Sequence, residues 1–387
     1  MRGAESPSLP GFLGAPLACL PASVAQRQRA SGQVRAVPAT PVAGRRSSSP
    51  GEVFAEVNVD LERFGARMRD EIDFLGRECE LNPPRLQQFD AWGQRVDQII
   101  TCPAWKRMKD ISAEESLVAE GYKRRYSSWS RVHQTAKLYL FMPSSGCYGC
   151  PLAMTDGAAK TIEITVVLRV TRGGTETIAR ELPDGSYSLH GFKWFTSATD
   201  SDMTLTLARI MAADGQIKQL DGARAHLISA EGQGIACIAN MLNISRIYNA
   251  IFAVGSMRRI VHMARDYATK REAFGKPLKD HPLHIQTLAR MEVQTHGAFL
   301  LMMETGRLLG LEETKKATEQ DEHMLRLLTP VIKLYTAKQV TFTFLPGAQC
   351  FPTMGEAFVY TGQMLMDPGG GRIHAGCHRR TRLSHER

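Results

Sequence analysis

The sequence predicts an α+β fold that is mainly α, with a small β region between two helical blocks. Apolar residues first recur every three or four positions, β-branched and alternating residues then take over, and the helical period finally returns. These changes predict an N-terminal helical domain at 52–160, an incomplete central β domain at 161–232 and an incomplete C-terminal antiparallel helix bundle at 233–350.

The first helical block is expected to begin near Glu52, because apolar residues follow it at the spacing of one helix face. These residues are Phe54, Val57, Leu61, Phe64, Met68, Ile72 and Leu75. Further helix is expected through about residue 140, with breaks at Pro83–Pro84 and Pro103. Ser112 followed by Glu115 has the spacing of a capping box, which predicts that another helix begins there.

The β region contains four stretches that are typical of strands. They are residues 161–171, 186–197, 203–210 and 225–229. Pro183, Asp184 and Gly185 favour a turn before the second stretch.

Three long helices are expected after Gly234, because apolar residues again recur at helical spacing. The first should end at Gly275, Lys276 and Pro277, where turn-forming residues gather. The helical pattern stops beyond Gln349, so residues 351–387 are expected to form an irregular tail.

The formal charge of +9 lies at the two ends of the chain. Residues 1–50 carry a net +5 and residues 372–387 a net +4, which leaves the body neutral. A groove for phosphates needs positive charge clustered on the folded body, so nucleic-acid binding is not expected. No apolar run is long enough to span a bilayer.

Residues 1–51 are rich in Ala, Pro, Ser and Arg and almost lack acidic residues. This composition is typical of a mitochondrial transit segment, and it is equally typical of a disordered extension on a cytoplasmic protein. The eight cysteines do not indicate a disulfide framework in a chain of this length. Cys147 and Cys150 lack two further ligands at matching spacing, so no metal site is expected.

Two motifs stand out against the background of the predicted elements. Trp194, Phe195 and Thr196 follow Lys193 in a strand-like stretch, and taken alone they favour an aromatic pair buried in a β core. The second motif is Arg-Glu-Ala-Phe-Gly-Lys-Pro-Leu at 271–278, preceded by Arg246 one helix length upstream. An arginine fork matches phosphate oxygens, which suits a dinucleotide.

These motifs, in this order of domains, resemble the acyl-CoA dehydrogenase family. The stretch 147–160 is similar to the branch that includes a bacterial alkylation-response protein and its eukaryotic relatives. The resemblance implies FAD, an acyl-CoA substrate that undergoes α,β-dehydrogenation, an electron-accepting flavoprotein and a homo-oligomer. The residues that it implies are Trp194, Phe195 and Thr196 at the flavin, Arg271 at the diphosphate, Phe274 near the cofactor, Gln349 at the adenine and Arg246 at the acyl-CoA. By the resemblance, the indole flanks the flavin ring and the hydroxyl two residues along donates to it.

The sequence also departs from the family. No residue matches the family's usual catalytic glutamate, so the catalytic residue is unknown, and Pro352 and Thr353 replace two expected glycines. We therefore expect a truncated or splice-altered chain. The alternative functions are a non-catalytic scaffold or regulator, or a nucleic-acid-associated relative, on the same fold.

Overall fold

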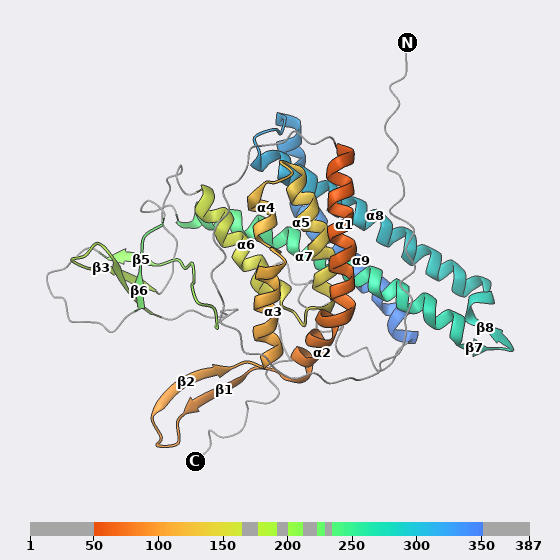
Figure 1. Cartoon of the computed structure of the whole chain (residues 1–387), viewed down its shortest axis with the longest axis horizontal. Coiled ribbons are helices and arrows are strands. Elements are labelled where there is room, and N and C mark those ends of the chain that lie inside the picture. The colour runs from red at the N-terminus through yellow and green to blue at the C-terminus, as the bar shows by residue number, and fades with distance from the viewer. Residues whose placement is uncertain (1–49, 165–176, 192–199, 212–222, 229–233, 351–387) are drawn as a thin grey trace, which may run out of the picture. The chain divides into compact units, whose positions relative to one another are not determined.

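A computed structural model of the chain describes residues 50–164, 177–191, 200–211, 223–228 and 234–350 (Figure 1). Helices dominate these residues and the strands are short, so the predicted fold class is confirmed. The helices of the first block are α1 (Pro50–Arg67), α2 (Asp73–Leu81), α3 (Pro103–Glu114), α4 (Ala119–Lys123), α5 (Trp129–Phe141) and α6 (Gly149–Ile164).

A single π-helical turn, Met68–Ile72, joins α1 to α2. Its end residues, Met68 and Ile72, are both buried, and the extra residue of the wide turn keeps successive apolar side chains directed at the core. Asn82 follows α2 and donates through its side chain to the Glu78 carbonyl oxygen at 2.9 Å. The next two residues are prolines, which cannot continue the helix.

Residues 85–100 correct the expectation of continuous helix. They form an antiparallel hairpin of β1 (Arg85–Phe89) and β2 (Arg95–Ile100), in which Arg85 pairs with Ile100. The decisive signal is the turn, where Asp90 Oδ1 accepts from the backbone N–H groups of Trp92 and Gln94, each at 2.9 Å. Trp92 at the tip is 86% exposed.

The four described strands of the central region form one sheet in the order β5-β3-β4-β6. They are β3 (Ile178–Glu181), β4 (Tyr187–His190), β5 (Arg209–Met211) and β6 (Ala223–Ala225). The expected turn joins β3 to β4, with Asp184 Oδ1 accepting from the Ser186 N–H at 3.0 Å.

Three strand predictions of this region are wrong in part. Residues 161–164 belong to the last turn of α6, and the rest of that stretch lies outside the described residues. Residues 203–208 are not strand, and β5 begins only at Arg209. In the stretch predicted at 225–229, β6 ends at Ala225 and residues 226–228 are not strand. In each case β-branched or apolar composition alone did not determine the local structure.

The long helices are α7 (Gly234–Lys270), α8 (Pro282–Glu313) and α9 (Glu319–Cys350). α7 packs against α6, α8 and α9, and α5 packs against α8. The main core draws on all of these helices, with Phe141, Ile251, Met257, Met302 and Ile332 almost fully buried. None of the described helices is long and apolar enough to cross a membrane.

Glycines let α8 approach α5 closely. A Cβ atom at Gly310 would lie 2.0 Å from the Ser128 carbonyl oxygen, and one at Gly306 would lie 2.7 Å from the Thr135 hydroxyl oxygen. Neither contact leaves room for a larger residue, so these two positions set the separation of the helices.

Candidate functional site

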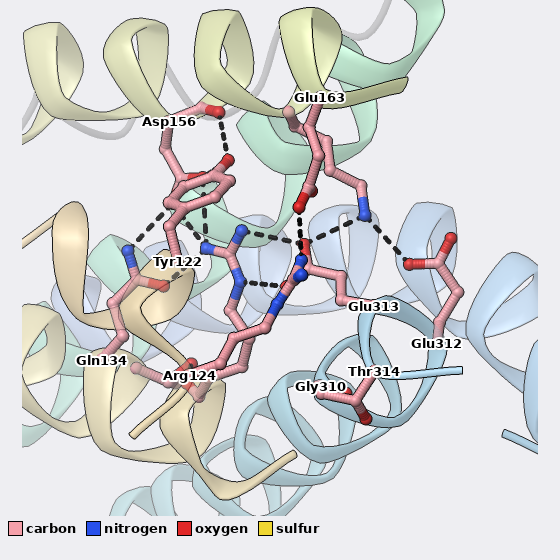
Figure 2. Close-up of polar contacts among 12 residues, drawn as sticks. Tyr122, Arg124, Gln134, Asp156, Glu163, Gly310, Glu312, Glu313 and Thr314 are labelled. Atoms are coloured by element: carbon pink, nitrogen blue, oxygen red, sulfur yellow. Dashed lines mark hydrogen bonds and ion pairs between the residues drawn. The ribbon is translucent and has the colours of Figure 1, made fainter. Parts of the chain in front are cut away.

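A buried polar cluster joins α4, α5, α6, α7 and α8 (Figure 2). At its centre the Asp156 carboxylate is fully buried. It accepts hydrogen bonds from Arg131 at 2.8 Å, Tyr122 at 2.7 Å, Tyr248 at 2.9 Å and Gln134 at 3.0 Å. These four donors occupy the acceptor positions of the carboxylate, so Asp156 has little capacity left to bind a substrate.

Arg131 extends the cluster to α8. Its Nε donates to Glu313 Oε2 at 2.7 Å and its Nη2 donates to Glu313 Oε1 at 2.8 Å. Lys160 reaches the same carboxylate at 3.0 Å and Glu312 at 3.1 Å (Figure 2). Burial alone would lower the pKa of Arg131, but the charges of Asp156 and Glu313 outweigh it and hold that pKa well above its usual range.

The two tyrosines of the cluster remain protonated. Burial raises the pKa of Tyr122 and of Tyr248, and the negative charge of Asp156 raises both pKa values further. Each hydroxyl therefore stays a hydrogen-bond donor. Because the acids and bases of the cluster are paired with each other, the arrangement suits a structural junction better than proton transfer.

A second buried carboxylate, Glu115, corrects the predicted capping box. Ser112 lies inside α3 and donates to the Met108 carbonyl oxygen at 2.7 Å, so no helix begins there. Glu115 instead receives Arg67 at 2.7 Å and Lys137 at 3.2 Å, and Arg63 also binds it. Burial would raise its pKa, yet these partners lower the pKa to about 2.

The Arg271 motif forms a β-hairpin with a two-residue turn directly after α7. Its strands are β7 (Glu272–Ala273) and β8 (Lys276–Pro277), and the predicted end of α7 at Gly275 is wrong because the helix stops at Lys270. The Leu278 N–H donates to the Arg271 carbonyl oxygen at 2.9 Å, which closes the hairpin.

Phe274 stands at the tip of this hairpin in an unusual conformation. Its φ is +51° and that of Gly275 is +78°, the pair of left-handed residues that a type I′ turn requires. Asn or Gly would adopt this conformation with less strain than a phenylalanine. Phe274 is also 98% exposed, so the side chain contributes almost nothing to the core of its own chain.

His281 contacts the hairpin and holds its conformation. Its Nε2 lies 2.9 Å from the Ala273 carbonyl oxygen, and its ring meets the Phe274 ring edge-on with centroids 6.2 Å apart. α8 begins at the next residue, Pro282. The hairpin is thus held between the end of one long helix and the start of another.

The Arg271 side chain is exposed and makes no hydrogen bond or ion pair with any residue that the structure describes. A planar guanidinium group without a partner, carried on a braced hairpin, can bind a phosphate or diphosphate through paired hydrogen bonds. The residues present at this position therefore fit a phosphate-bearing cofactor.

Comparison with known proteins identifies the family. Residues 50–171 match the Adaptive response protein AidB N-terminal domain, and residues 232–351 match the Acyl-CoA dehydrogenase, C-terminal domain. The chain belongs to the acyl-CoA dehydrogenase family. Both the predicted resemblance and its AidB-like branch are confirmed.

The relatives of this acyl-CoA dehydrogenase family member include one curated protein and two solved structures. Acyl-CoA dehydrogenase family member 11 of Caenorhabditis elegans is 39% identical over 79% of this chain and 62% of its own length. The crystal structure of Caenorhabditis elegans ACDH-11 in complex with C11-CoA has a TM-score of 0.74 and 38% identity, covering 82% of this chain and 66% of that one. The structure called Bd2924 apo-form has a TM-score of 0.72 and 35% identity, covering 82% and 77%. The chain spans about three fifths of the length of the curated relative.

The described residues include only some of the predicted family residues. Trp194, Phe195 and Thr196 lie outside the described residues, and Gln349 lies in the last turn of α9. Arg246 is on α7, where it donates to Asn243 Oδ1 at 2.9 Å. The rest of α7 lies between Arg246 and Arg271, which is about 36 Å along the helix axis at 1.5 Å per residue. The two arginines therefore cannot bind the same group within one chain.

Four buried polar atoms in α8 and α9 were not predicted from sequence. His284 Nε2, Glu292 Oε2, Gln339 Oε1 and Thr343 Oγ1 have no hydrogen-bond partner in the part of the chain that the structure describes, although Glu292 Oε2 lies 3.7 Å from an Arg265 nitrogen. The short connection at 314–318 makes α8 and α9 antiparallel, so the first turn of α8 lies at the same end as the last turns of α9. Unpaired buried polar atoms are rare in native proteins, which makes these positions notable.

Sequence analysis also missed the Asp156 cluster. Asp156 and Lys160 are four residues apart in α6, a spacing that normally indicates an exposed ion pair. Only the side chains that arrive from α5, α7 and α8 make these positions buried, and no local pattern in α6 reports them.

Proposed function

We propose that the protein is an FAD-dependent oxidoreductase that carries out α,β-dehydrogenation of an acyl-CoA. The observation that carries the proposal is the braced hairpin at 271–278. It presents an Arg271 side chain that has no polar partner among the described residues, beside an exposed, left-handed Phe274. A side chain held in this way at a conformational cost indicates an external binding partner.

Different residues of the chain would contact different parts of the cofactor. Arg271 would bind the FAD diphosphate, Trp194, Phe195 and Thr196 would line the flavin, and Gln349 would contact the adenine. The bound flavin would supply hydride acceptance. Arg246 would serve the acyl-CoA, and a flavoprotein would take up the electrons.

The substrate class is supported by the relative that was solved with C11-CoA, which covers most of this chain. We therefore propose a medium or longer acyl-CoA. Apolar helix faces are suited to line a slot for such a chain.

A homo-oligomer would bring Arg271 to a neighbour's cofactor. The described parts of α8 and α9 leave large apolar side chains exposed at helical spacing, which favours burial against another copy. They are Leu283, Val293 and Leu300 on α8 and Leu327, Val331, Leu334 and Phe342 on α9.

A non-catalytic FAD or acyl-CoA binding protein is the second candidate. It is favoured by the ion pairs of the buried carboxylates among the described residues. Asp156, Glu115 and Glu313 are each engaged by a cationic side chain, so none of these three is free to remove a proton from a substrate.

The test begins with the absorbance spectrum of the purified full chain after incubation with FAD, followed by anaerobic addition of undecanoyl-CoA. Stoichiometric flavin that bleaches supports the dehydrogenase, and stoichiometric flavin that does not bleach supports the binding protein. A folded but colourless protein would overturn the dehydrogenase and any FAD-binding function. Arg271→Ala should weaken FAD binding at least tenfold, the loss of a charged hydrogen bond, while Lys276→Ala in the same hairpin should leave it nearly unchanged.

A further inference from the structure

The β1–β2 hairpin exposes apolar side chains from its base to its tip. Leu81 ends α2 just before the hairpin and is 74% exposed, and Trp92 at the tip is exposed as well. Between them, Leu86 pairs with Ile99 across the two strands, so both side chains lie on one face of the hairpin. We call Leu81, Leu86, Ile99 and Trp92 the apolar stripe.

The hairpin has little support from the rest of the described chain. Its two strands form a separate two-stranded sheet, every residue of β1 is exposed, and in β2 only Ile99 is partly buried. A two-stranded ribbon is only marginally stable in water unless its apolar side chains pack against something else. The apolar stripe is therefore expected to be covered by a partner.

The outer edges of the hairpin are unsuited to pairing with a further strand. Between Gln87 and Phe89 the register shifts, because β2 has one residue more there, and Asp97 of β2 has a φ of +43°. Arg95 also forms an ion pair with Asp97 at 2.6 Å. On β1 the Gln87 side chain donates to the Phe89 carbonyl oxygen at 3.2 Å. Bulges and charged side chains hinder strand addition, so a partner meets a face of the hairpin rather than an edge.

Charge and backbone chemistry narrow the kind of partner. Two arginines and two aspartates, Arg85, Arg95, Asp90 and Asp97, make residues 85–100 neutral, so the hairpin has no excess charge for a phosphate-rich surface. The hydrocarbon of a membrane would leave the backbone groups of both outer edges without hydrogen bonds. A protein surface is the remaining partner, since it can bury the apolar stripe while the edges stay in water.

We propose that the apolar stripe packs on the same stripe of a second copy of this chain. Because the stripe runs from the base to the tip of the hairpin, a two-fold axis that reverses the strand direction places it on itself. Trp92 of each copy then meets Leu81 of the other copy, and the strand residues of the stripe lie between these two ends. A two-fold interface requires a self-matching surface of this kind, and symmetric dimers are the commonest protein assemblies.

The size of the contact sets its strength. Strands of five and six residues cover a face about 20 Å long and about 10 Å wide. With the tip and the base included, the two copies together bury on the order of 1,000 Å², which is at the low end for specific interfaces. The contact alone should therefore be weak and depend on concentration. One charge in the apolar stripe should disrupt it, because that charge would lose water without gaining a partner.

This contact is independent of the proposed function. It uses the end of α2 and the β1–β2 hairpin, whereas the association proposed above uses α8, α9 and Phe274. It also needs neither FAD nor an acyl-CoA. Either contact can therefore fail in an experiment while the other persists.

The experiment compares the full chain with the variants Leu86→Glu and Gln87→Glu. Both add one negative charge to β1, but Gln87 lies on the opposite face from Leu86. Sedimentation velocity at concentrations up to about 100 µM measures weak association, and hydrogen–deuterium exchange with mass spectrometry follows the amides of residues 85–100. Leu86→Glu should weaken association about tenfold or more and speed exchange of these amides about tenfold, whereas Gln87→Glu should match the wild type.

Both variants are also made in the Phe274→Asn chain, so that association through α8 and α9 does not mask the result. Circular dichroism should show unchanged helices, since both substitutions lie outside the core. Equal effects of Leu86→Glu and Gln87→Glu on association would overturn the proposal. So would amides of residues 85–100 that exchange equally fast in the wild type and in Leu86→Glu. Binding of the wild type to phosphatidylcholine vesicles that Leu86→Glu abolishes would assign the apolar stripe to a membrane instead.

Discussion

Arg131 of α5 and Glu313 of α8 are joined by two parallel hydrogen bonds, at 2.7 and 2.8 Å, although 182 residues separate them in the chain. Both side chains are almost fully buried. This bidentate pair ties the first helical block to the C-terminal bundle. Since removing one partner leaves an uncompensated buried charge, its loss should be costly.

Glu313→Gln should lower the free energy of unfolding by about 3–5 kcal/mol, because Arg131 and Lys160 would each lose a charged partner. Urea denaturation followed by circular dichroism measures the change. The matched control is Glu312→Gln, since Glu312 also binds Lys160 but its side chain is 38% exposed, against 1% for Glu313. We expect the control to cost no more than about 1 kcal/mol. Equal effects of the two substitutions would contradict the assignment of Glu313 to the junction.

Gly310→Ala should destabilise the protein by about 1–3 kcal/mol, because the added Cβ would collide with the Ser128 carbonyl oxygen on α5. Gly297→Ala on the same helix has no atom within 4 Å of the added Cβ and should be neutral or stabilising by up to about 1 kcal/mol. Thermal unfolding of the two variants provides the comparison. A Gly310→Ala protein as stable as the Gly297→Ala protein would show that α5 and α8 are not in close contact.

Stability should fall in acid partly because of Glu115. Its pKa is about 2 in the folded chain against a usual value of 4.5, so it stabilises the fold above pH 4.5 and this contribution is lost as the pH falls toward 2. The contribution is on the order of 3 kcal/mol. In Glu115→Gln, the free energy of unfolding should be lower at pH 7 and should depend less on pH between 4.5 and 2. A variant with the wild-type pH dependence would rule out Glu115 as the source.

The substitution Phe274→Asn should show whether Phe274 affects the stability of the single chain or its association with a second copy. Asn adopts the left-handed conformation more readily than Phe, so the isolated chain should keep or slightly increase its melting temperature. If Phe274 inserts into a neighbouring copy, sedimentation equilibrium should show weaker self-association by a factor of ten or more. Unchanged association would remove Phe274 from the proposed contact between copies.

The long helices of this fold were predictable from sequence. Helices with apolar residues at regular spacing, such as α1 and α7, are specified locally along the chain. The Arg271 motif was found by its resemblance to a family signature, although its Gly and Pro misplaced the end of α7, which stops at Lys270. The hairpin at 85–100 was missed because its strands are short and its turn depends on the side chain of Asp90.

The buried polar side chains could not be predicted for a different reason. Asp156, Arg131 and Glu313 come from three helices, and each looks like a surface residue on its own helix. Their burial is a property of tertiary contacts, which a single sequence without an alignment does not report. The same holds for Ser112 and Glu115, whose spacing imitates a cap although their contacts lie elsewhere.

The long separation between Arg131 and Glu313 has a consequence for synthesis of the chain. At translation rates of about 5–20 residues per second, roughly 10 to 40 seconds pass between the addition of these two residues on the ribosome. During that interval the nascent chain holds Arg131 and Lys160 without Glu313, their acidic partner on α8. The first helical block therefore cannot reach its final packing until residue 313 has left the exit tunnel, and its inward faces stay open to chaperones until then.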